Sequence, residues 1–266
     1  MSYLTLYQKS SIHNLILNED MGRMIILTGP SCIGKSPLDQ ALKRFYPEIR
    51  DQVQPLVLWN SRDPRPGEID GVQYHFSPIE KFKELKSNSD FVVMEVRGDT
   101  QALNVKELSK NLLKGDVFYE GNTYMAKLLI ELEAIKQYAK TSMFISPLSR
   151  EEIQFLTSKE APQDLSRMIT DIMRRKLLRR TKKQKGELSL KDLENIETRA
   201  NSAYKEMKEA YHFDFVIPNH DGEDSEHWNA FYYPIGDARN TLLTVKEIIS
   251  NNNSNRAEKW DGYVLA

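Results

Sequence analysis

One segment decides the fold: Gly29-Pro-Ser-Cys-Ile-Gly34-Lys35-Ser36. It fits the pattern G-x-x-x-x-G-K-[ST] in full, and it lies between the apolar run 23–28 and apolar residues at helical spacing over 38–45. The glycines allow successive backbone N–H groups to surround an anion, and the N-terminus of a following helix adds its positive dipole end. The segment therefore predicts a strand, a phosphate-binding loop and a helix, in that order.

Within this loop, two side chains carry the chemistry. Lys35 can reach the β- and γ-phosphates of ATP, and Ser36 can ligate Mg²⁺. Pro37 is compatible with the first helical turn, where the missing N–H has no intrahelical partner. Cys32 is interpreted as a small loop filler rather than a redox group. The candidate ATP-binding residues of the loop are Gly29, Pro30, Ser31, Cys32, Ile33, Gly34, Lys35, Ser36 and Pro37.

The composition sets limits on the class of protein. The chain has 266 residues, of which 40% are hydrophobic and 28% charged, with a formal net charge of -1 and one cysteine. This length suits one α/β domain, or one domain with an inserted subdomain. A single cysteine fits a reducing cytosol, so we expect a cytoplasmic protein. No run of about 18 apolar residues predicts a membrane span, and residues 1–22 lack the features of a signal peptide.

Strands and helices alternate along the chain. Apolar runs typical of buried strands follow the first one at 53–58, 91–96, 116–119, 142–146 and 213–218. Helical patterns lie between most of them, at 105–113, 125–139 and 151–156. This order predicts an α/β fold with a parallel central sheet covered on both faces, the three-layer architecture of P-loop NTPases. The asparagine-rich stretch 251–255 indicates a frayed tail.

One segment is strongly basic. Eight of the twelve residues over 174–185 are Lys or Arg, and a long helical pattern follows over 189–211. We interpret the segment as a helical, mobile basic lid. A solvated helix face explains the pattern equally well on sequence alone, and clustered basic residues also suit nucleic acid. The balanced total charge argues against nucleic acid as a partner, and the sequence carries no signal for an oligomeric state.

A second motif suggests a family. The stretch Ser61-Arg62-Asp-Pro-Arg65-Pro-Gly67-Glu68-Ile-Asp-Gly71-Val-Gln-Tyr74-His-Phe76 resembles the guanylate kinase signature T-R-x-P-R-x-G-E-x-x-G-x-x-Y-x-F. Met143-Phe-Ile-Ser-Pro-Leu-Ser149, Glu197-Thr-Arg199-Ala and 213–219 are similar to later family segments. The likeness is strong over 24–76 and patchier to 219, and 221–237 has no counterpart in the family.

The resemblance implies a domain organisation. We expect an extension over 1–22, a guanylate-kinase-like domain over 23–250 with an acceptor-binding subdomain at 54–104 and a lid at 163–205, and a tail over 251–266. The sequence assigns no role to the extension or to the insertion 221–237.

The resemblance also implies roles for individual residues. Arg62, Arg65 and Tyr74 match the residues that hold the phosphate of the acceptor, and guanidinium groups pair bidentately with phosphate. Arg179 or Arg180, together with Arg199, would arrive with the lid and stabilise the transferred phosphoryl group; the basic cluster does not indicate which of the two acts. By position, the residue after the last strand, Asn219, is assigned to ATP.

Two acidic residues complete the implied site. Glu95 matches the glutamate that accepts hydrogen bonds from N1 and N2 of guanine. Glu120 falls where the family has an aspartate that orients Mg²⁺ through water, so Ser36 and Glu120 are the candidate metal residues.

The chain departs from the family pattern where the base would bind. Leu58 stands in place of a hydroxyl residue, and 99–104 replaces the family's N-Y-Y-G-T/S stretch, with Gln101 at the position of a phosphate-binding tyrosine. Asn122 replaces a second acid. We therefore expect transfer of the γ-phosphoryl group of ATP to a nucleoside monophosphate, with GMP as the first choice. The alternatives are another phosphorylated acceptor, such as a different nucleotide or a sugar phosphate, and an inactive guanylate-kinase-like interaction module.

Overall fold

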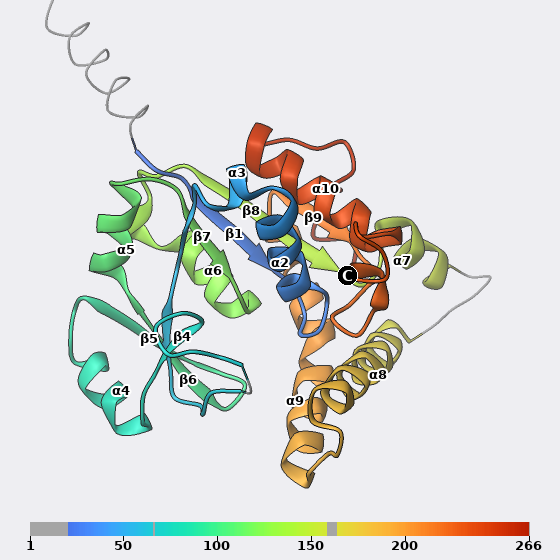
Figure 1. The fold of residues 1–266 in the computed structure, drawn as a ribbon, viewed down its shortest axis with the longest axis horizontal. Coiled ribbons are helices and arrows are strands. Elements are labelled where there is room, and N and C mark those ends of the chain that lie inside the picture. Colours follow the sequence, from blue (N-terminus) through green and yellow to red (C-terminus); the bar gives the residue numbers. More distant parts are fainter. Residues whose placement is uncertain (1–20, 66, 159–163, 266) are drawn as a thin grey trace, which may run out of the picture.

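The computed structural model describes residues 21–65, 67–158 and 164–265. Almost all of the extension expected over 1–22 lies outside these residues. The described chain forms a five-stranded central sheet, a smaller four-stranded sheet and a pair of long helices (Figure 1).

The central sheet is parallel throughout. Its order is β2-β7-β1-β8-β9, and every neighbouring pair is parallel. The strands are β1 (Met24–Thr28), β2 (Gln54–Pro55), β7 (Val117–Glu120), β8 (Lys140–Ser146) and β9 (Phe215–Pro218). The predicted parallel sheet is confirmed. Because parallel strands end at the same edge, the loops after β1 and β7 meet at one edge of the sheet.

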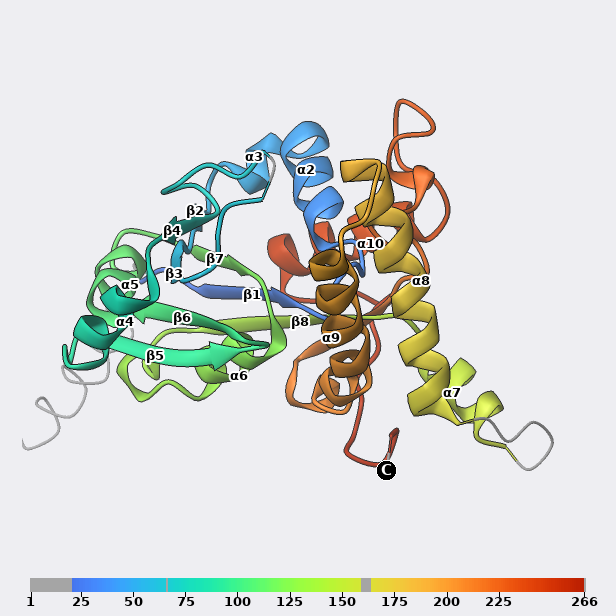
Figure 2. The ribbon, with the colours of Figure 1, turned by 90° about the horizontal axis from the view of Figure 1, so that it is seen from below.

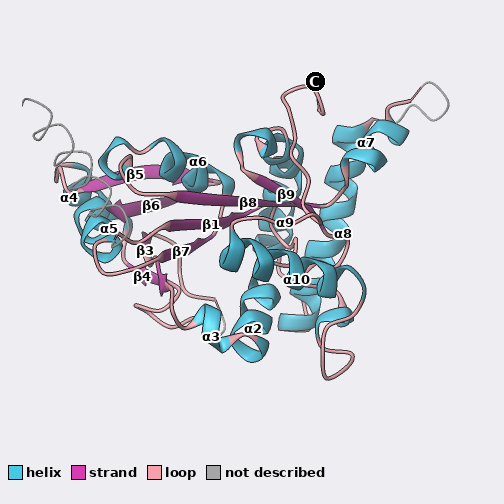
Figure 3. Cartoon of the chain, turned by 90° about the horizontal axis from the view of Figure 1, so that it is seen from above, coloured by secondary structure: helices cyan, strands magenta, loops and turns pink. Residues whose placement is uncertain are grey.

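Helices cover both faces of this sheet (Figure 3). Helices α2 (Lys35–Phe45) and α10 (Gly236–Asn251) lie on one side, and α6 (Thr123–Glu131) lies on the other. Further short helices are α3 (Pro47–Arg50), α5 (Val105–Leu112), α7 (Arg150–Leu156), η1 (Glu133–Ile135) and η2 (Ala210–His212).

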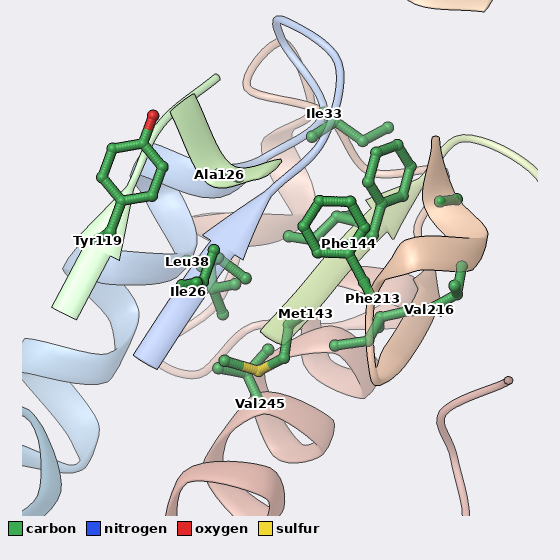
Figure 4. Packing of buried hydrophobic residues seen from close by; sticks show 14 of the residues in the cluster. Ile26, Ile33, Leu38, Tyr119, Ala126, Met143, Phe144, Phe213, Val216 and Val245 are labelled. Carbon is green, nitrogen blue, oxygen red and sulfur yellow. The ribbon is translucent and has the colours of Figure 1, made fainter. Parts of the chain in front are cut away.

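The core lies between these layers (Figure 4). Ile26, Leu38, Met143 and Val245 come from different strands and helices and are fully buried. Each such side chain contributes about 1.5–3 kcal/mol when it leaves water.

The second sheet carries the arginine-rich signature. It comprises β3 (Leu58–Asn60), β4 (Tyr74–Phe76), β5 (Phe91–Val96) and β6 (Asp99–Asn104), in the order β4-β3-β6-β5. Helix α4 (Ile79–Lys86) packs Phe82 and Leu85 against Ala102 on one face. Arg97 and Gly98 join β5 to β6 with φ angles of 55° and 89°, the positive values of a tight hairpin turn.

The basic segment lies within a helical hairpin. Helices α8 (Leu165–Lys185) and α9 (Leu190–Met207) run side by side in Figures 1 and 2. The face of α8 that bears Ile169, Met173 and Leu177 is buried. This helix is therefore amphipathic: it has a buried apolar face and is not solvated on all sides.

The C-terminus corrects one expectation. We predicted a frayed tail after 250, but Val216 and Glu258 exchange backbone hydrogen bonds of 2.8 and 2.7 Å, and Trp260 and Leu265 are buried. The apolar side chains that follow the asparagine run return the chain to the core, which the composition of 251–255 did not indicate.

The insertion is also ordered. It contains η3 (Glu226–Trp228), and Trp228 is buried against the phosphate-binding loop. Within the described ranges, every helix is too short or too polar to span a bilayer.

Candidate active site

The phosphate-binding loop follows β1 directly and leads into α2. Gly29 and Gly34 have φ angles of 142° and 105°. A Cβ atom on Gly29 would lie 2.4 Å from the carbonyl oxygen of Ile145, and one on Gly34 would lie 2.7 Å from that of Asp221. Both positions therefore require glycine for two reasons, the backbone conformation and the close approach. Burial raises the pKa of the Cys32 thiol to about 12, so this group stays protonated at neutral pH.

The loop lysine is buried and faces the loop backbone. Lys35 Nζ donates to the carbonyls of Gly29 (2.9 Å) and Pro30 (2.8 Å). Burial lowers the pKa of Lys35, although the carboxylates of Glu223 and Glu120 oppose the shift.

A hydroxyl and a carboxylate meet beside this lysine. Ser36 Oγ donates to Glu120 Oε1 over 3.5 Å. Burial raises the pKa of Glu120 to about 7. Two hard oxygen donors at this spacing fit Mg²⁺, which binds through few protein ligands and completes its shell with phosphates and water. Among the described residues, no group of three or more His, Cys, Asp or Glu could hold a metal ion.

A cavity of about 630 Å³ joins this loop to the small sheet and the helical hairpin. The expected site residues that line it are Gly29, Ser31, Cys32, Lys35, Ser36, Arg62, Arg65, Tyr74, Gln101, Glu120, Arg180 and Arg199. The structure thus brings together groups from four separate parts of the sequence.

The acceptor-side arginines differ in how they are held. Arg62 makes two hydrogen bonds to Glu68, of 2.6 and 2.7 Å, and its guanidinium stacks 5.2 Å from the ring centre of Tyr74. The Arg65 guanidinium has no carboxylate partner among the described residues, and burial followed by the charge of Arg62 lowers its pKa. Gln101 is buried and accepts a 2.9 Å hydrogen bond from Asn122.

The lid arginines separate into two groups. Arg180 lines the cavity and forms a 2.8 Å ion pair with Glu223. Arg199 also lines it, and burial together with the charges of Arg65 and Arg180 lowers its pKa to about 9. The Arg179 side chain is 66% exposed, pairs with Asp224 at 3.0 Å and does not line the cavity. We therefore leave Arg179 out of the site, because consecutive helical residues point about 100° apart.

Glu95 does not fit its expected role. It is exposed and does not line the cavity, whereas the next residue, Val96, does. Successive strand residues face opposite sides of a sheet, so Glu95 points away from the site. On the small sheet, Leu58 and Leu103 are buried and apolar. The guanine contact implied for Glu95 therefore has no support in this structure.

Asn219 also has a different role. Its side chain is fully buried, and its amide donates to the carbonyls of Ile33 and Asp221, each over 2.8 Å. It braces the phosphate-binding loop and is not free to contact ATP. The Ile33 side chain is likewise buried, and Ile33 does not line the cavity.

Arg97 and Glu223 are among the cavity residues that sequence reasoning missed. Arg97, at the β5–β6 turn, donates to Ser31 Oγ over 3.0 Å and pairs with the fully buried Glu206. Glu223 comes from the insertion 221–237. No motif marks either residue: Arg97 comes just before the altered stretch 99–104, and Glu223 lies in the insertion. Only the positive charge at a hairpin tip could have drawn attention to Arg97.

Comparisons with known proteins agree on one family. The family model described as "Guanylate kinase" matches residues 21–177. A guanylate kinase of Wolinella succinogenes is 30% identical over 216 residues, which is 79% of this chain and 82% of the relative. A guanylate kinase of Aromatoleum aromaticum is 29% identical over 208 residues, or 75% and 81% of the two chains. The crystal structure of guanylate kinase from Anaplasma phagocytophilum shares the fold, with a TM-score of 0.50 at 18% identity over 91% and 92% of the chains.

Proposed function

Because this chain belongs to the guanylate kinase family, we propose that it transfers the γ-phosphoryl group of ATP to GMP, forming ADP and GDP. The chain is a nucleoside monophosphate kinase by family. The proposal for this chain rests on one observation. The loop lysine, the acceptor-side arginines, and Arg180 and Arg199 of the lid all line the same cavity. Phosphoryl transfer needs positioning and charge neutralisation more than covalent help, and this cavity supplies both.

On the donor side, Lys35 and the loop backbone would hold the β- and γ-phosphates. Ser36 and Glu120 would hold Mg²⁺, which neutralises phosphate charge when bound. The distance of 3.5 Å between their oxygens supports this pairing.

On the acceptor side, Arg62, Arg65, Tyr74 and Gln101 would hold the monophosphate. Arg65 and Arg199 are cavity cations without carboxylate partners among the described residues. Burying cations without counterions is costly, and two phosphate groups brought close together would offset that cost. Arg180 and Arg199 would then stabilise the equatorial oxygens of the transferred group.

The rival hypotheses are separated by one pair of measurements. Calorimetry with Mg²⁺ and ATP tests the inactive module, which we disfavour because the loop Gly34-Lys35-Ser36 is intact and borders an open cavity. A screen of phosphorylated acceptors by coupled ADP release tests the substrate. We expect ATP binding and the highest turnover with GMP; ADP release with another acceptor alone would replace GMP in the proposal. A cytoplasmic location is part of the same proposal.

A further inference from the structure

We propose that Glu223, supplied by the insertion 221–237, is a positioning residue that orients Arg180 for phosphoryl transfer; this inference rests on the proposed function. The insertion has no counterpart in the family pattern, yet it brings a carboxylate to the wall of the cavity.

The insertion is fixed to the phosphate-binding loop. Glu223 N donates to the carbonyl of Cys32 over 3.4 Å, and a Cβ atom on Gly222 would lie 2.3 Å from the same oxygen. The buried Trp228 donates its indole N–H to the carbonyls of Asp221 (3.0 Å) and Gly222 (3.1 Å). The backbone at Glu223 is therefore set by the loop that would hold ATP, and its side chain starts from a defined place.

The same segment also holds helix α8. On α8, Lys176 lies three residues before Arg179 and four before Arg180, so it neighbours both arginines on the helix surface. Lys176 Nζ donates to the carbonyl of His220 over 2.5 Å, Arg179 pairs with Asp224 at 3.0 Å, and Arg180 pairs with Glu223 at 2.8 Å. The basic helix is thus docked on the segment 220–224, which connects it to the phosphate-binding loop.

The ion pair with Glu223 is placed so that it can hold the Arg180 side chain in one orientation. The two side chains are only 15% and 14% exposed, so solvent screens their attraction weakly. Glu223 engages Nη1 alone, and Nε of Arg180 is buried without a partner. Arg180 also lines the cavity, so Glu223 holds the guanidinium through one nitrogen at the wall where the phosphates would lie. Burial lowers the pKa of Arg180, but the charge of Glu223, its hydrogen bond to the guanidinium and the charge of Asp224 act together to raise it, so the arginine stays charged.

The pairing with Arg180 also neutralises the negative charge of Glu223. A lone carboxylate beside Lys35 would repel the phosphates of ATP, whereas a carboxylate neutralised by Arg180 does not. An arginine of this kind contributes about 10³–10⁵ in rate, and misplacement by about 1 Å can cost on the order of 10²-fold. Glu223 therefore matters for the orientation of Arg180 rather than for the binding of ATP.

A double-mutant cycle in the full chain tests this role. The variants are Glu223→Gln, Arg180→Ala and the double variant, with Arg180→Lys as a substitute if Arg180→Ala does not fold. Glu226→Gln is the matched control, because Glu226 is an exposed acid in the same insertion. For each protein, kcat and KM are measured with GMP, and the Kd for ATP with Mg²⁺ is measured by calorimetry.

We expect Glu223→Gln to lower kcat about 10- to 100-fold without raising the KM for ATP more than about twofold. In the Arg180→Ala background the same change should alter kcat less than about twofold, and it should tighten ATP binding because it removes an unpaired negative charge. The proposal would be overturned if Glu223→Gln changed kcat by the same factor in the wild-type and Arg180→Ala backgrounds, and likewise changed the Kd for ATP by the same factor in both. A wild type that binds ATP but leaves GMP unchanged would refute the proposed function instead, and the Kd cycle would then decide the role of Glu223 alone.

Discussion

At the scale of single residues, Lys35 is the residue whose role is most clearly defined. Its ammonium group lies between two loop carbonyls and lines the cavity, so phosphate oxygens entering there would meet it directly. We expect Lys35→Ala to keep the fold and to lower turnover by about 10³, the lower end of the range for charged groups that clamp the transferred phosphate. Circular dichroism checks the fold and coupled ADP release checks the rate. A variant that kept more than about a tenth of the turnover would show that the lysine is not needed.

Glu95 gives the opposite prediction. Because it points away from the cavity, Glu95→Gln should change kcat/KM for GMP less than about twofold, whereas the loss of a charged hydrogen bond to the base would cost about 1.5–3 kcal/mol. Arg62→Ala is the comparison, since it should weaken every monophosphate acceptor alike. A drop of tenfold or more in the Glu95 variant, seen with GMP and not with AMP, would return Glu95 to the base-binding site.

Lys35 and Glu95 show how much of the site can be predicted from the sequence. The loop and the Arg62, Arg65 and Tyr74 set follow from long motifs. Lys35 and Ser36 of the loop line the cavity together with these three residues. The direction of Glu95 depends on strand register, where a shift of one residue moves a side chain to the other face. The direction of Arg179 depends on helix phase, where the same shift turns it by about 100°. Motif position alone does not settle that register.

At the scale of elements, local patterns predict most strands and helices. The run 91–96 is the strand β5 to the residue, whereas the helix expected over 125–139 ends at Glu131, where Leu132 adopts an extended conformation. The tail was mispredicted because a polar run says nothing about the apolar residues beyond it. Trp260 belongs to the core through contacts distant in sequence, which single-sequence patterns do not contain.

The tail gives a prediction about stability. Trp260 is 3% exposed, so Trp260→Ala should lower the free energy of unfolding by about 3–5 kcal/mol, the range for large aromatic side chains removed from a core. Tyr263→Ala, at an 87% exposed position in the same tail, should change it by less than about 0.5 kcal/mol. Urea unfolding measures the free energy of unfolding of both variants. If Trp260→Ala lowered it as little as Tyr263→Ala does, the tail would be frayed.

The junction after β9 gives a prediction about pH. His220 bridges Asp237 (2.5 Å) and Glu152 (2.8 Å). Burial lowers the pKa of His220, but the hydrogen bond to Asp237 and the neighbouring carboxylate charges outweigh it, and the pKa is raised above 6.5.

The pKa of His220 is higher in the folded state than in the unfolded state, so protonated His220 stabilises the fold. This stabilisation is fully present below pH 6.5, the pKa of the unfolded state. The stabilisation is lost as pH rises through the folded pKa. The groups are half-exposed, so the effect is at most about 1 kcal/mol. Thermal unfolding from pH 5.5 to 8.5 should show wild type losing this advantage over His220→Gln; a constant difference would contradict the linkage.

At the scale of the whole molecule, the central claim is that separate parts of the chain converge on one phosphoryl-transfer site. The parallel sheet places the loop, the small sheet carries the acceptor arginines, and the docked hairpin supplies Arg180 and Arg199. The sequence predicted this architecture because each part has its own motif. It did not predict the contribution of the insertion, since Glu223 reaches the cavity only through tertiary packing.

The most direct test follows the phosphoryl group itself. Full-length protein is incubated with GMP, Mg²⁺ and ATP labelled in the γ-phosphate, and the nucleotides are separated. We predict that the label moves into GDP in equal amounts with the ADP formed, and that Lys35→Ala reduces this transfer by about 10³. ATP binding without labelled GDP, or labelled phosphate released to water alone, would contradict the account.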